Sequence, residues 1–524
     1  MRDIEAMAFE TGDVSGLELM ELAGRQVYEQ TLVEFPHLAR SPGGALVLCG
    51  PGNNGGDGYV IARYLMQSGW QVQCFAMATP ENLPPDARTM AERFLGLPGA
   101  EMRAVQDAPC ETRLVQAFDL VIDAVFGSGL TRAFERHAAL QLSLAAAWRD
   151  RRASGIGPRF VAVDIPSGLC ADSGRVLGSS PGDSLRDTLH ADLTVTFETP
   201  FLGHRLAQGP ELCGKVVVAP LGRCVARVRA EQDRNGMVWP IETPRAADIH
   251  KSGAAHKFGY GHALVLAGGA GHGGAAQLAA RAALRVGAGL VTLGPPETAM
   301  AEHAAGPVAA LMQRAVDSAA DLKALLQDTR FSALVVGPGL GLDGRGAELV
   351  AAALEADRPV VMDADALTLL ARDTALRKLI HAKVIITPHE GELARLCPDV
   401  MRRFWEPARD GPAFSAVDVA RETARDLGCR VVFKGRATVL AAPSGGAWVH
   451  GGEPARAAPD LATAGSGDVL AGMIGGLLAR RLPPRVAAAS AIWLHAEAAR
   501  SIGPGLIADD LPEALPGVLR ALPL

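Results

Sequence analysis

Short apolar runs alternate with Ala-rich amphipathic stretches along most of the chain. The runs that predict buried strands end at Gly, Asp or Pro clusters. They lie at Ala45–Cys49, Leu120–Ile122 and Phe160–Val163 in the first half, and at Ala263–Leu266, Ala333–Val336, Pro359–Met362, Val384–Ile386 and Arg430–Phe433 in the second. This alternation predicts an α/β fold with parallel sheets, in which ligands gather at the carboxyl ends of the strands.

The pattern breaks between about Leu221 and His250, where charged residues and prolines replace the periodic apolar positions. We place the domain boundary in this stretch, with a first domain over residues 1–222, a linker over 223–248 and a second domain over 249–524. The two halves share no repeated motif, so we interpret the chain as a fusion of two different units.

The 524-residue chain has a formal net charge of −6 and no long basic run, so we do not expect nucleic acid as its main partner. Its eight cysteines are dispersed and form no C-x-x-C pair, which predicts free thiols in a reducing compartment. The N-terminus lacks the apolar core of a signal peptide, and no apolar stretch approaches the roughly 20 residues of a membrane span. We therefore expect a cytoplasmic protein without a membrane partner.

A glycine-rich stretch, residues 50–58, follows the first predicted strand, and we expect a helix to begin near Tyr59. Its five glycines allow positive φ and close backbone approach, and a following helix N-terminus attracts anions. The stretch also carries Asn53, Asn54 and Asp57. It fits either a phosphate or dinucleotide cradle or an ordinary tight turn, and the polar side chains favour the cradle.

Asp123 and Asp164 each follow a predicted strand and precede a glycine-containing loop. A carboxylate at such a place can act as a general acid or base, or as a cation ligand. It can equally cap a helix or form a turn. Neither aspartate decides between these roles by itself.

Three ordered motifs resemble the NAD(P)H-hydrate epimerase (YjeF N-terminal) family over about residues 1–222. They are Asn-Asn-Gly-Gly-Asp-Gly (53–58), Val-Ile-Asp-Ala-Val-Phe-Gly-Ser-Gly-Leu (121–130) and Val-Asp-Ile-Pro-Ser-Gly-Leu (163–169). The resemblance implies a Rossmann-like three-layer sandwich and a potassium ion held by Asn54, Asp123 and Ser167. It implies proton transfer by Asp164 at the hydroxyl-bearing ring carbon, and substrate contacts from Asn53, Asn54, Gly55, Gly56, Asp57, Gly127, Ser128, Gly129, Leu130, Thr131, Arg132, Ala133 and Asp164. Phe201 stands where members of the family often carry a Lys.

In the second half, Gly465, Ser466, Gly467 and Asp468 open a long apolar helical run. Small residues let several N–H groups point at one anion, and the helix dipole adds to that attraction. A carboxylate beside the anion can deprotonate a hydroxyl that attacks a phosphoryl group. The alternative is a capped, glycine-softened helix start, and the three small neighbours of Asp468 favour the catalytic interpretation.

Further polar residues follow other predicted strands of this half. Lys434 opens a flexible loop that either contacts phosphate or turns a hairpin. His389 can orient a substrate or have a structural role, and Glu392 can act through a water-bound magnesium ion. Asp363 and Asp365 fit turn and cap positions as well as site positions. No P-loop sequence is present, so we do not expect a P-loop enzyme.

In order, these pieces are similar to the NAD(P)H-hydrate dehydratase family, a ribokinase-like α/β family, from about His250 to the C-terminus. Other matching segments are His256–Gly259, Gly268–Ala275, Ala282–Arg285, Gly287–Leu290 and Gly337–Gly341. The resemblance implies that Asp468 activates the substrate hydroxyl to attack the terminal phosphoryl group, after which phosphate leaves. It implies hydrate contacts from Ala275, Gly339, His389 and Asp468, and nucleotide contacts from Lys434, Gly435, Arg436, Ala437, Thr438 and Gly467. The fused layout resembles that of bacterial members, which implies ADP with magnesium as the phosphoryl donor and AMP as a product.

Together the two resemblances imply the repair of hydrated NAD(P)H. Hydration of the ring produces both epimers at the new hydroxyl centre, and a stereospecific dehydratase processes only one, the S hydrate. An epimerase on the same chain would supply it from the R hydrate. We therefore expect NAD(P)H hydrates and ADP as ligands, and a homo-oligomer.

Two alternatives stay open. A ribokinase-like hydroxymethylpyrimidine or thiazole kinase would share the glycine loop and Asp468 but release a stable phosphorylated product. The first half would then be a non-catalytic nucleotide-binding module.

Overall fold

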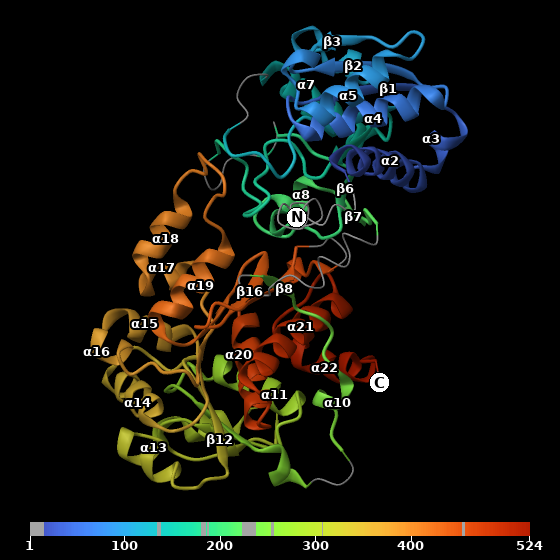
Figure 1. The fold of residues 1–524 in the computed structure, drawn as a ribbon. Coiled ribbons are helices and arrows are strands. Elements are labelled where there is room, and N and C mark those ends of the chain that lie inside the picture. The colour runs from blue at the N-terminus through green and yellow to red at the C-terminus, as the bar shows by residue number, and fades with distance from the viewer. Residues whose placement is uncertain are drawn as a thin grey trace. The chain divides into compact units, whose positions relative to one another are not determined.

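The computed structural model describes residues 15–133, 138–179, 185, 188–222, 237–252, 256–306, 308–452 and 456–523. The chain forms two compact units, which Figure 1 shows. The first contains residues 1–234 and 405–415, and the second contains residues 235–404 and 416–524. Most of the predicted linker, 223–236, lies outside the described residues, and its last part, from 237 onward, forms elements of the second unit.

Seven described strands form the parallel sheet of the first unit, in the order β3-β2-β1-β4-β5-β6-β7. They are β1 (Gly44–Cys49), β2 (Gln71–Ala76), β3 (Met102–Ala104), β4 (Leu120–Ala124), β5 (Arg159–Val163), β6 (Leu193–Phe197) and β7 (Lys215–Ala219). The three strands predicted from apolar runs in this half are confirmed as β1, β4 and β5. The order reverses between β1 and β4, so the loops after these strands flank the crevice where doubly wound sheets bind ligands.

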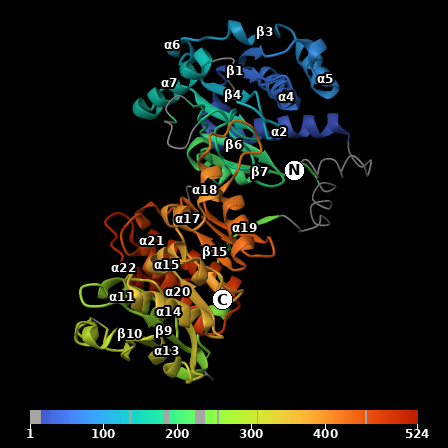
Figure 2. The same cartoon turned by 90° about the vertical axis from the view of Figure 1, so that its left-hand side faces the viewer.

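The helices of the first unit cover both faces of this sheet, and Figure 2 shows α4 and α5 on one side and α7 on the other. One apolar cluster joins α2, α4 and α5 to the sheet, and a second joins α7 to the opposite face. The unit is therefore a three-layer sandwich. Its described helices are α2 (Gly16–Glu34), α3 (Pro36–Arg40), α4 (Asn53–Gln67), α5 (Pro85–Leu95), α6 (Thr112–Val115), α7 (Ala138–Ser154) and α8 (Gly209–Leu212).

Helix α4 begins at Asn53, so the expected start near Tyr59 was wrong. Gly55, Gly56 and Gly58 lie inside the helix and serve close packing. A Cβ at Gly55 would lie 2.0 Å from the carbonyl oxygen of Gly50, and a Cβ at Gly58 would lie 2.7 Å from Cys49 Sγ. None of the five glycines has a positive φ. A glycine-rich sequence can therefore continue a helix where the backbone must approach a strand closely.

Ten described strands form the sheet of the second unit, in the order β11-β10-β9-β12-β13-β14-β15-β16-β17-β8. They are β8 (Val238–Pro240), β9 (His262–Leu266), β10 (Leu290–Gly294), β11 (Met312–Gln313), β12 (Phe331–Val336), β13 (Val360–Met362), β14 (Val384–Ile386), β15 (Arg430–Phe433), β16 (Ala437–Ala441) and β17 (Ala447–Gly451). Strands β9 to β15 are parallel, whereas β16 is antiparallel to both of its neighbours. The five strands predicted in this half are confirmed. The strand order reverses between β9 and β12.

The apolar helix α20 lies deep in the second unit, packed against α11, α21 and the sheet. A Cβ at Gly472 would lie 2.0 Å from the carbonyl oxygen of Ala279, and one at Gly475 would lie 2.1 Å from Val335 Cγ2. This close packing fixes the start of α20, which carries Asp468. The described helices are α10 (Ala246–Ile249), α11 (Gly273–Arg285), α12 (Met300–Ala304), α13 (Ala319–Leu325), α14 (Gly344–Glu355), α15 (Ala364–Arg372), α16 (Thr374–Arg377), α17 (Glu390–Leu396), α18 (Pro398–Trp405), α19 (Ala416–Leu427), α20 (Ser466–Ala479), α21 (Pro484–Ile502) and α22 (Asp510–Arg520).

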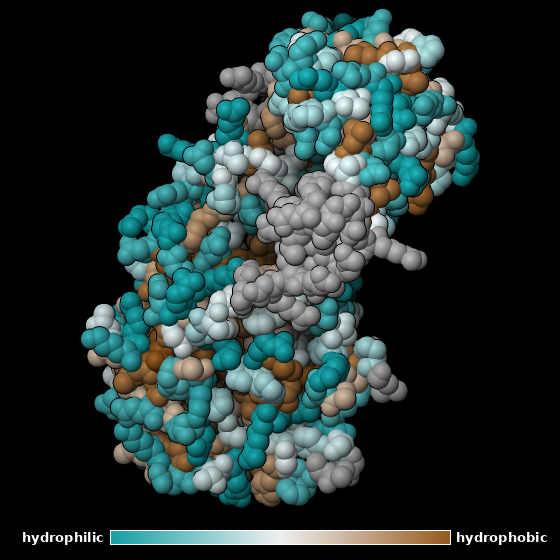
Figure 3. Space-filling model, in the orientation of Figure 1, coloured by the Kyte–Doolittle hydropathy of each residue, from teal (hydrophilic) through white to brown (hydrophobic). Residues whose placement is uncertain are grey.

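Hydrophilic residues predominate on the face of each unit that Figure 3 shows. None of the described helices is both long enough and apolar enough to cross a membrane. The described cysteines are free thiols, at positions 49, 74, 110, 170, 213, 397 and 429. Cys224 lies outside the described residues.

Candidate active sites

Asp164 follows β5 directly and has a φ of 68°, in the left-handed region. Its Oδ2 accepts a hydrogen bond from Ser128 N at 2.9 Å, and its Oδ1 accepts one from Thr196 Oγ1 at 3.1 Å. A non-glycine residue keeps such a backbone conformation only where surrounding contacts compensate for the strain. The two bonds fix the carboxylate against the loop that begins at Gly127.

His204 holds the backbone of Asp164. Its Nδ1 accepts a hydrogen bond from Phe201 N at 3.1 Å, so Nε2 carries the proton and donates to the carbonyl oxygen of Asp164 at 2.9 Å. Burial lowers the pKa of His204, which keeps the ring neutral. Phe201, in the place of the implied Lys, packs beside the buried side chains of Ile165 and Leu169. Sequence reasoning missed His204, because a single His outside any motif carries no signal.

A cluster of oxygen atoms lies beside this carboxylate, at the end of β4. Asp123 Oδ1 accepts a hydrogen bond from Ser167 Oγ at 2.6 Å, and Asp123 Oδ2 accepts one from Ser167 N at 2.8 Å. The carbonyl oxygen of Phe126 lies 3.3 Å from Ser167 Oγ. Burial raises the pKa of Asp123, and the hydrogen bonds from Ser167 oppose that shift.

The three predicted potassium ligands are chemically suited to a potassium ion. Asn54 Nδ2 is buried and has no hydrogen-bond partner among the described residues. The side chains of Asn54, Asp123 and Ser167 all carry hard oxygen donors. No group of three or more His, Cys, Asp or Glu in the described part of the chain could hold a metal ion, but a potassium site needs no such group.

The structure brings Asn54, Gly127 and Asp164 together. A Cβ at Gly127 would lie 2.9 Å from both Asn54 Oδ1 and Asp164 Oδ2. The other predicted substrate contacts are divided between two places. Asn53 to Asp57 lie in the first turns of α4, and residues 128–133 continue the loop after β4.

In the second unit, Asp468 lies in the first turn of α20, after Gly465 with a φ of 88°. Burial raises the pKa of Asp468 to about 7; the carboxylate of Asp363 adds to this shift, and the ammonium of Lys434 opposes it. The side chain is half-buried. A carboxylate with a pKa near neutrality can both accept and release a proton at physiological pH.

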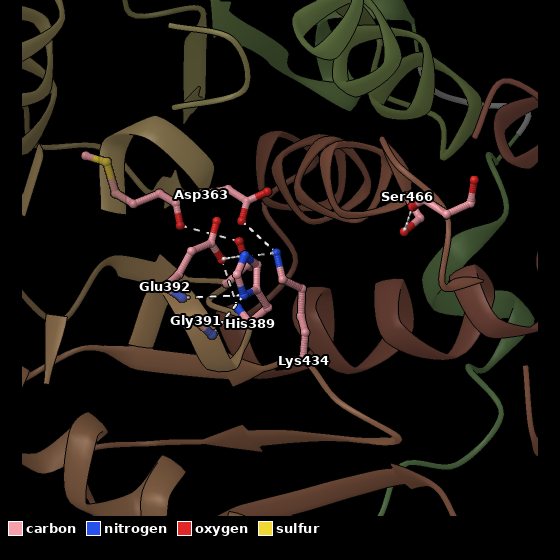
Figure 4. Close-up of polar contacts among 9 residues, drawn as sticks. Asp363, His389, Gly391, Glu392, Lys434 and Ser466 are labelled. Carbon is pink, nitrogen blue, oxygen red and sulfur yellow. Dashed lines mark hydrogen bonds and ion pairs between the residues drawn. The ribbon is translucent and has the colours of Figure 1, made fainter. Parts of the chain in front are cut away.

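Lys434 lies between two acidic side chains, Asp363 directly after β13 and Glu392 in the first turn of α17, as Figure 4 shows. Its Nζ is 2.9 Å from Asp363 Oδ1 and 3.8 Å from Glu392 Oε2. Burial alone would lower the pKa of Lys434, but the two carboxylates outweigh it and the pKa is raised. A Cβ at Gly467 would lie 3.1 Å from Lys434 Nζ, so this permanent cation borders the start of α20.

His389 caps helix α17. Its Nδ1 accepts a hydrogen bond from Gly391 N at 3.0 Å, and Glu392 Oε2 accepts one from His389 N at 2.8 Å. The proton is therefore on Nε2, which lies 3.6 Å from Glu392 Oε2. The ring is more than half exposed. His389 thus caps α17 through Nδ1, while its Nε2–H lies near the cluster of charges and is left available to a substrate.

The two remaining aspartates have different roles. Asp363 occupies the N-cap position of α15 but makes no side-chain capping bond, because its carboxylate binds Lys434. Asp365 Oδ2 accepts a hydrogen bond from Gly341 N at 2.9 Å and fixes the loop after β12. In that loop Gly339 has a φ of 63°, and a Cβ there would lie 3.5 Å from the Cβ of Ala275. The predicted hydrate contacts Gly339 and Ala275 are therefore neighbours.

The predicted nucleotide contacts lie on a hairpin and on the helix start. Gly435 and Arg436 form the turn between the antiparallel strands β15 and β16, and Ala437 and Thr438 begin β16. Lys434 and Gly467 are brought together, as described above. Residues 434–436 thus form a hairpin turn whose first residue reaches the charged cluster.

Two residues hold the start of α20 in place. Ser466 Oγ donates to the carbonyl oxygens of Leu461 at 2.8 Å and Thr463 at 3.0 Å. His495, on α21, is buried, and burial lowers its pKa to about 4 while a hydrogen bond to the Ser466 backbone opposes the shift. A neutral His495 therefore packs behind the loop. Its position in an Ala-rich helix gave no sequence signal.

Comparisons with known proteins match each half of the chain to a known family. The NAD(P)H-hydrate dehydratase family matches residues 263–514, and the family of the YjeF-related protein N-terminus matches residues 16–203. A bifunctional NAD(P)H-hydrate repair enzyme Nnr from Moorella thermoacetica is 34% identical over 542 residues, covering 100% of this chain and 96% of that protein. The chain belongs to the family of bifunctional NAD(P)H-hydrate repair enzymes.

Other members of this family and a solved structure are also similar. The Coxiella burnetii repair enzyme is 35% identical over 528 residues, covering 98% of this chain and 96% of that protein. A Bacillus subtilis ADP/ATP-dependent NAD(P)H-hydrate dehydratase, crystallised with ATP and Mg²⁺, is 28% identical with a TM-score of 0.44. The match covers 56% of this chain and 100% of that one.

Proposed function

We propose that this chain repairs hydrated NAD(P)H, with the first unit interconverting the R and S hydrates and the second dehydrating the S hydrate with ADP. The main support for the dehydratase activity of the second unit is the position of Asp468 beside the cation of Lys434 and the small residues of Gly465–Gly467. The pKa of Asp468 is raised there to about 7. A base and an anion site then lie within one cluster. The proposal extends the family's activity to these particular residues.

In the second unit, Asp468 takes the proton from the hydroxyl of the hydrate. The resulting alkoxide attacks the terminal phosphorus of ADP, and the bond to the AMP oxygen breaks, so AMP leaves. The phosphate ester is then eliminated as the adjacent ring carbon loses a proton, which forms the ring double bond and gives NAD(P)H and phosphate. Lys434 and the N–H groups at the start of α20 stabilise the negative charge during transfer.

Magnesium would accompany the nucleotide. Because Lys434 pairs with Asp363 and Glu392, these carboxylates are partly occupied, and an ion held mainly by phosphate oxygens and water suits the site. Bound magnesium would neutralise charge on the transferring phosphoryl group. The side chain of Glu392 can contact such an ion through water.

In the first unit, Asp164 moves the proton at the hydroxyl-bearing ring carbon of the hydrate. The bonds from Ser128 N and Thr196 Oγ1 orient its carboxylate, and the loop after β4 contacts the substrate. Asn54, Asp123 and Ser167 would hold potassium, which supplies a fixed positive charge beside the substrate. The free thiols of the described part suit a cytoplasmic protein, and we propose a homo-oligomer in that compartment.

One assay tests the whole proposal. Each hydrate epimer is incubated separately with the purified chain and with ADP or ATP, and the recovery of NAD(P)H absorbance, free phosphate and AMP are measured. We expect complete conversion of both epimers with ADP, with one phosphate per NAD(P)H formed. Replacing potassium by choline should leave the R hydrate unconverted while the S hydrate still reacts.

Three outcomes would contradict parts of the proposal. Persistence of the R hydrate in potassium means that the first unit is not an epimerase. A stable phosphorylated product without free phosphate identifies a small-molecule kinase instead. Faster turnover with ATP than with ADP removes the ADP assignment but leaves the dehydratase.

A further inference from the structure

A segment from the second half of the sequence belongs to the compact unit formed by the first half. Residues 405–415, here called the brace segment, connect α18 to α19 along the chain. The rest of that half, residues 235–404 and 416–524, forms the second unit. The brace segment therefore belongs to the first unit, although the other residues of that unit lie far away in the sequence. Its contacts show which parts of the first unit it holds.

Apolar contacts anchor the brace segment. Ala408 and Ala413 are buried together with Cys170 and Leu177, and the partly buried Leu130 packs against the same cluster. Ala408 is 3% exposed. Leu130 lies in the loop that follows β4, so the segment contacts that loop as well as the neighbouring residues 169–178.

Hydrogen bonds add to this anchor. The buried guanidinium of Arg175 donates to the carbonyl oxygens of Glu406 and, at 3.4 Å, of Phe414. Gly178 N donates to the carbonyl oxygen of Ala408 at 2.8 Å. Burial lowers the pKa of Arg175, but a guanidinium stays charged, so these carbonyl oxygens satisfy a buried cation. The segment is thus built into the first unit and does not merely lie on it.

The brace segment also bonds the proposed substrate loop directly. Gly411 N donates to the carbonyl oxygen of Thr131 at 2.9 Å, and Asp410 forms an antiparallel bridge with Arg132. At Gly411 a Cβ would lie 3.0 Å from the carbonyl oxygen of Leu130. Backbone contacts from the brace segment therefore hold residues 130–132.

We propose that the brace segment positions the substrate loop of the first unit, so that residues from the second half of the sequence determine how tightly the first site binds the hydrate. The inference rests on the proposed epimerase function. Besides its bond from Ser128 N in this loop, Asp164 keeps two bonds from outside the loop, from Thr196 Oγ1 and His204 Nε2. Loss of the brace should therefore weaken substrate binding and leave proton transfer largely intact.

Two variants of the full chain test this proposal. Gly411→Val places a side chain against Leu130, and Ala408→Glu places a charge in the apolar cluster. Arg409→Gln is the matched control, because it changes the charge by the same amount as Ala408→Glu at an exposed neighbour. We expect both variants to raise the epimerase KM roughly tenfold, about the contribution of one hydrogen bond, with little change in kcat. The control should match the wild type.

Hydrogen–deuterium exchange of the same proteins gives a second readout that needs no activity. We expect faster exchange at residues 127–133 in both variants and not in Arg409→Gln. Unchanged exchange there in both variants overturns the proposal, as does faster exchange with an unchanged KM. If the wild-type chain does not epimerise at all, the proposed function fails, whereas the exchange result still decides whether the brace segment holds the loop.

Discussion

Each unit presents one aspartate as its proposed proton-transfer group, Asp164 after β5 and Asp468 in the first turn of α20, but the two units surround it differently. Asp164 accepts hydrogen bonds from Ser128 and Thr196, and a neutral His204 holds its backbone. Asp468 instead lies among other charges, where burial and then Asp363 raise its pKa to about 7 and Lys434 limits the shift. In the first unit hydrogen bonds fix where the carboxylate points. In the second unit, burial and neighbouring charges set the pH at which the carboxylate of Asp468 gains or loses its proton.

The largest effect is expected for the variant that removes the proposed base of the second site and leaves the first site intact. Asp468→Asn removes the proposed base, and we expect the ADP-dependent dehydration of the S hydrate to fall by about a thousandfold. Epimerisation of the same hydrate should continue. Absorbance recovery and epimer ratio measure the two activities in one preparation. Asp399→Asn, at an exposed aspartate of the same unit, is the control, and dehydration that survives in Asp468→Asn would remove this residue from the mechanism.

The reciprocal change tests the first site. Asp164→Asn keeps an oxygen that can accept the bond from Ser128 N but cannot transfer a proton. We expect epimerisation to fall by about a hundredfold or more, with S-hydrate dehydration unchanged. The rate of interconversion of purified epimers, measured without nucleotide, checks this. Unchanged interconversion would favour a non-catalytic nucleotide-binding role for the first unit.

The pH dependence should distinguish the second site from the first. A general base must be deprotonated, so we expect dehydratase kcat/KM to rise about tenfold per pH unit below a midpoint near 7 and then level off. Because Glu392 contributes to the raised pKa of Asp468, Glu392→Gln should move the midpoint to lower pH. A midpoint that stays in place would assign the titration to the nucleotide or to another group.

The smallest effect concerns the hydrogen bonds that orient Asp164. His204→Ala removes the donor to the Asp164 carbonyl oxygen, and we expect a loss of roughly fivefold to tenfold in epimerase kcat. His204→Gln, which can restore a donor, should recover part of that loss. Dehydratase activity should not respond to either change. Equal rates in wild type and His204→Ala would mean that the other bonds suffice to hold Asp164.

The sequence patterns predicted much of this architecture. Every strand inferred from an apolar run is present, because a central parallel strand is buried on both faces and must be apolar throughout. Strand β2 escaped notice, since Gln71 and Gln73 interrupt its apolar run in a half-exposed position. Strand β8 escaped because its three residues gain a partner only from β17, far along the chain.

The sequence alone determined the residue types at the strand ends, and motif order determined the family. Tertiary structure decided the rest. It turned Asp363 from a helix cap into the partner of Lys434, placed His204 behind Asp164, and added residues 405–415 to the first unit. The physical reason is range: apolar periodicity and turn chemistry act over a few residues. Electrostatic neighbours and packing partners are set by which strands and loops lie side by side, and a chain position does not reveal them.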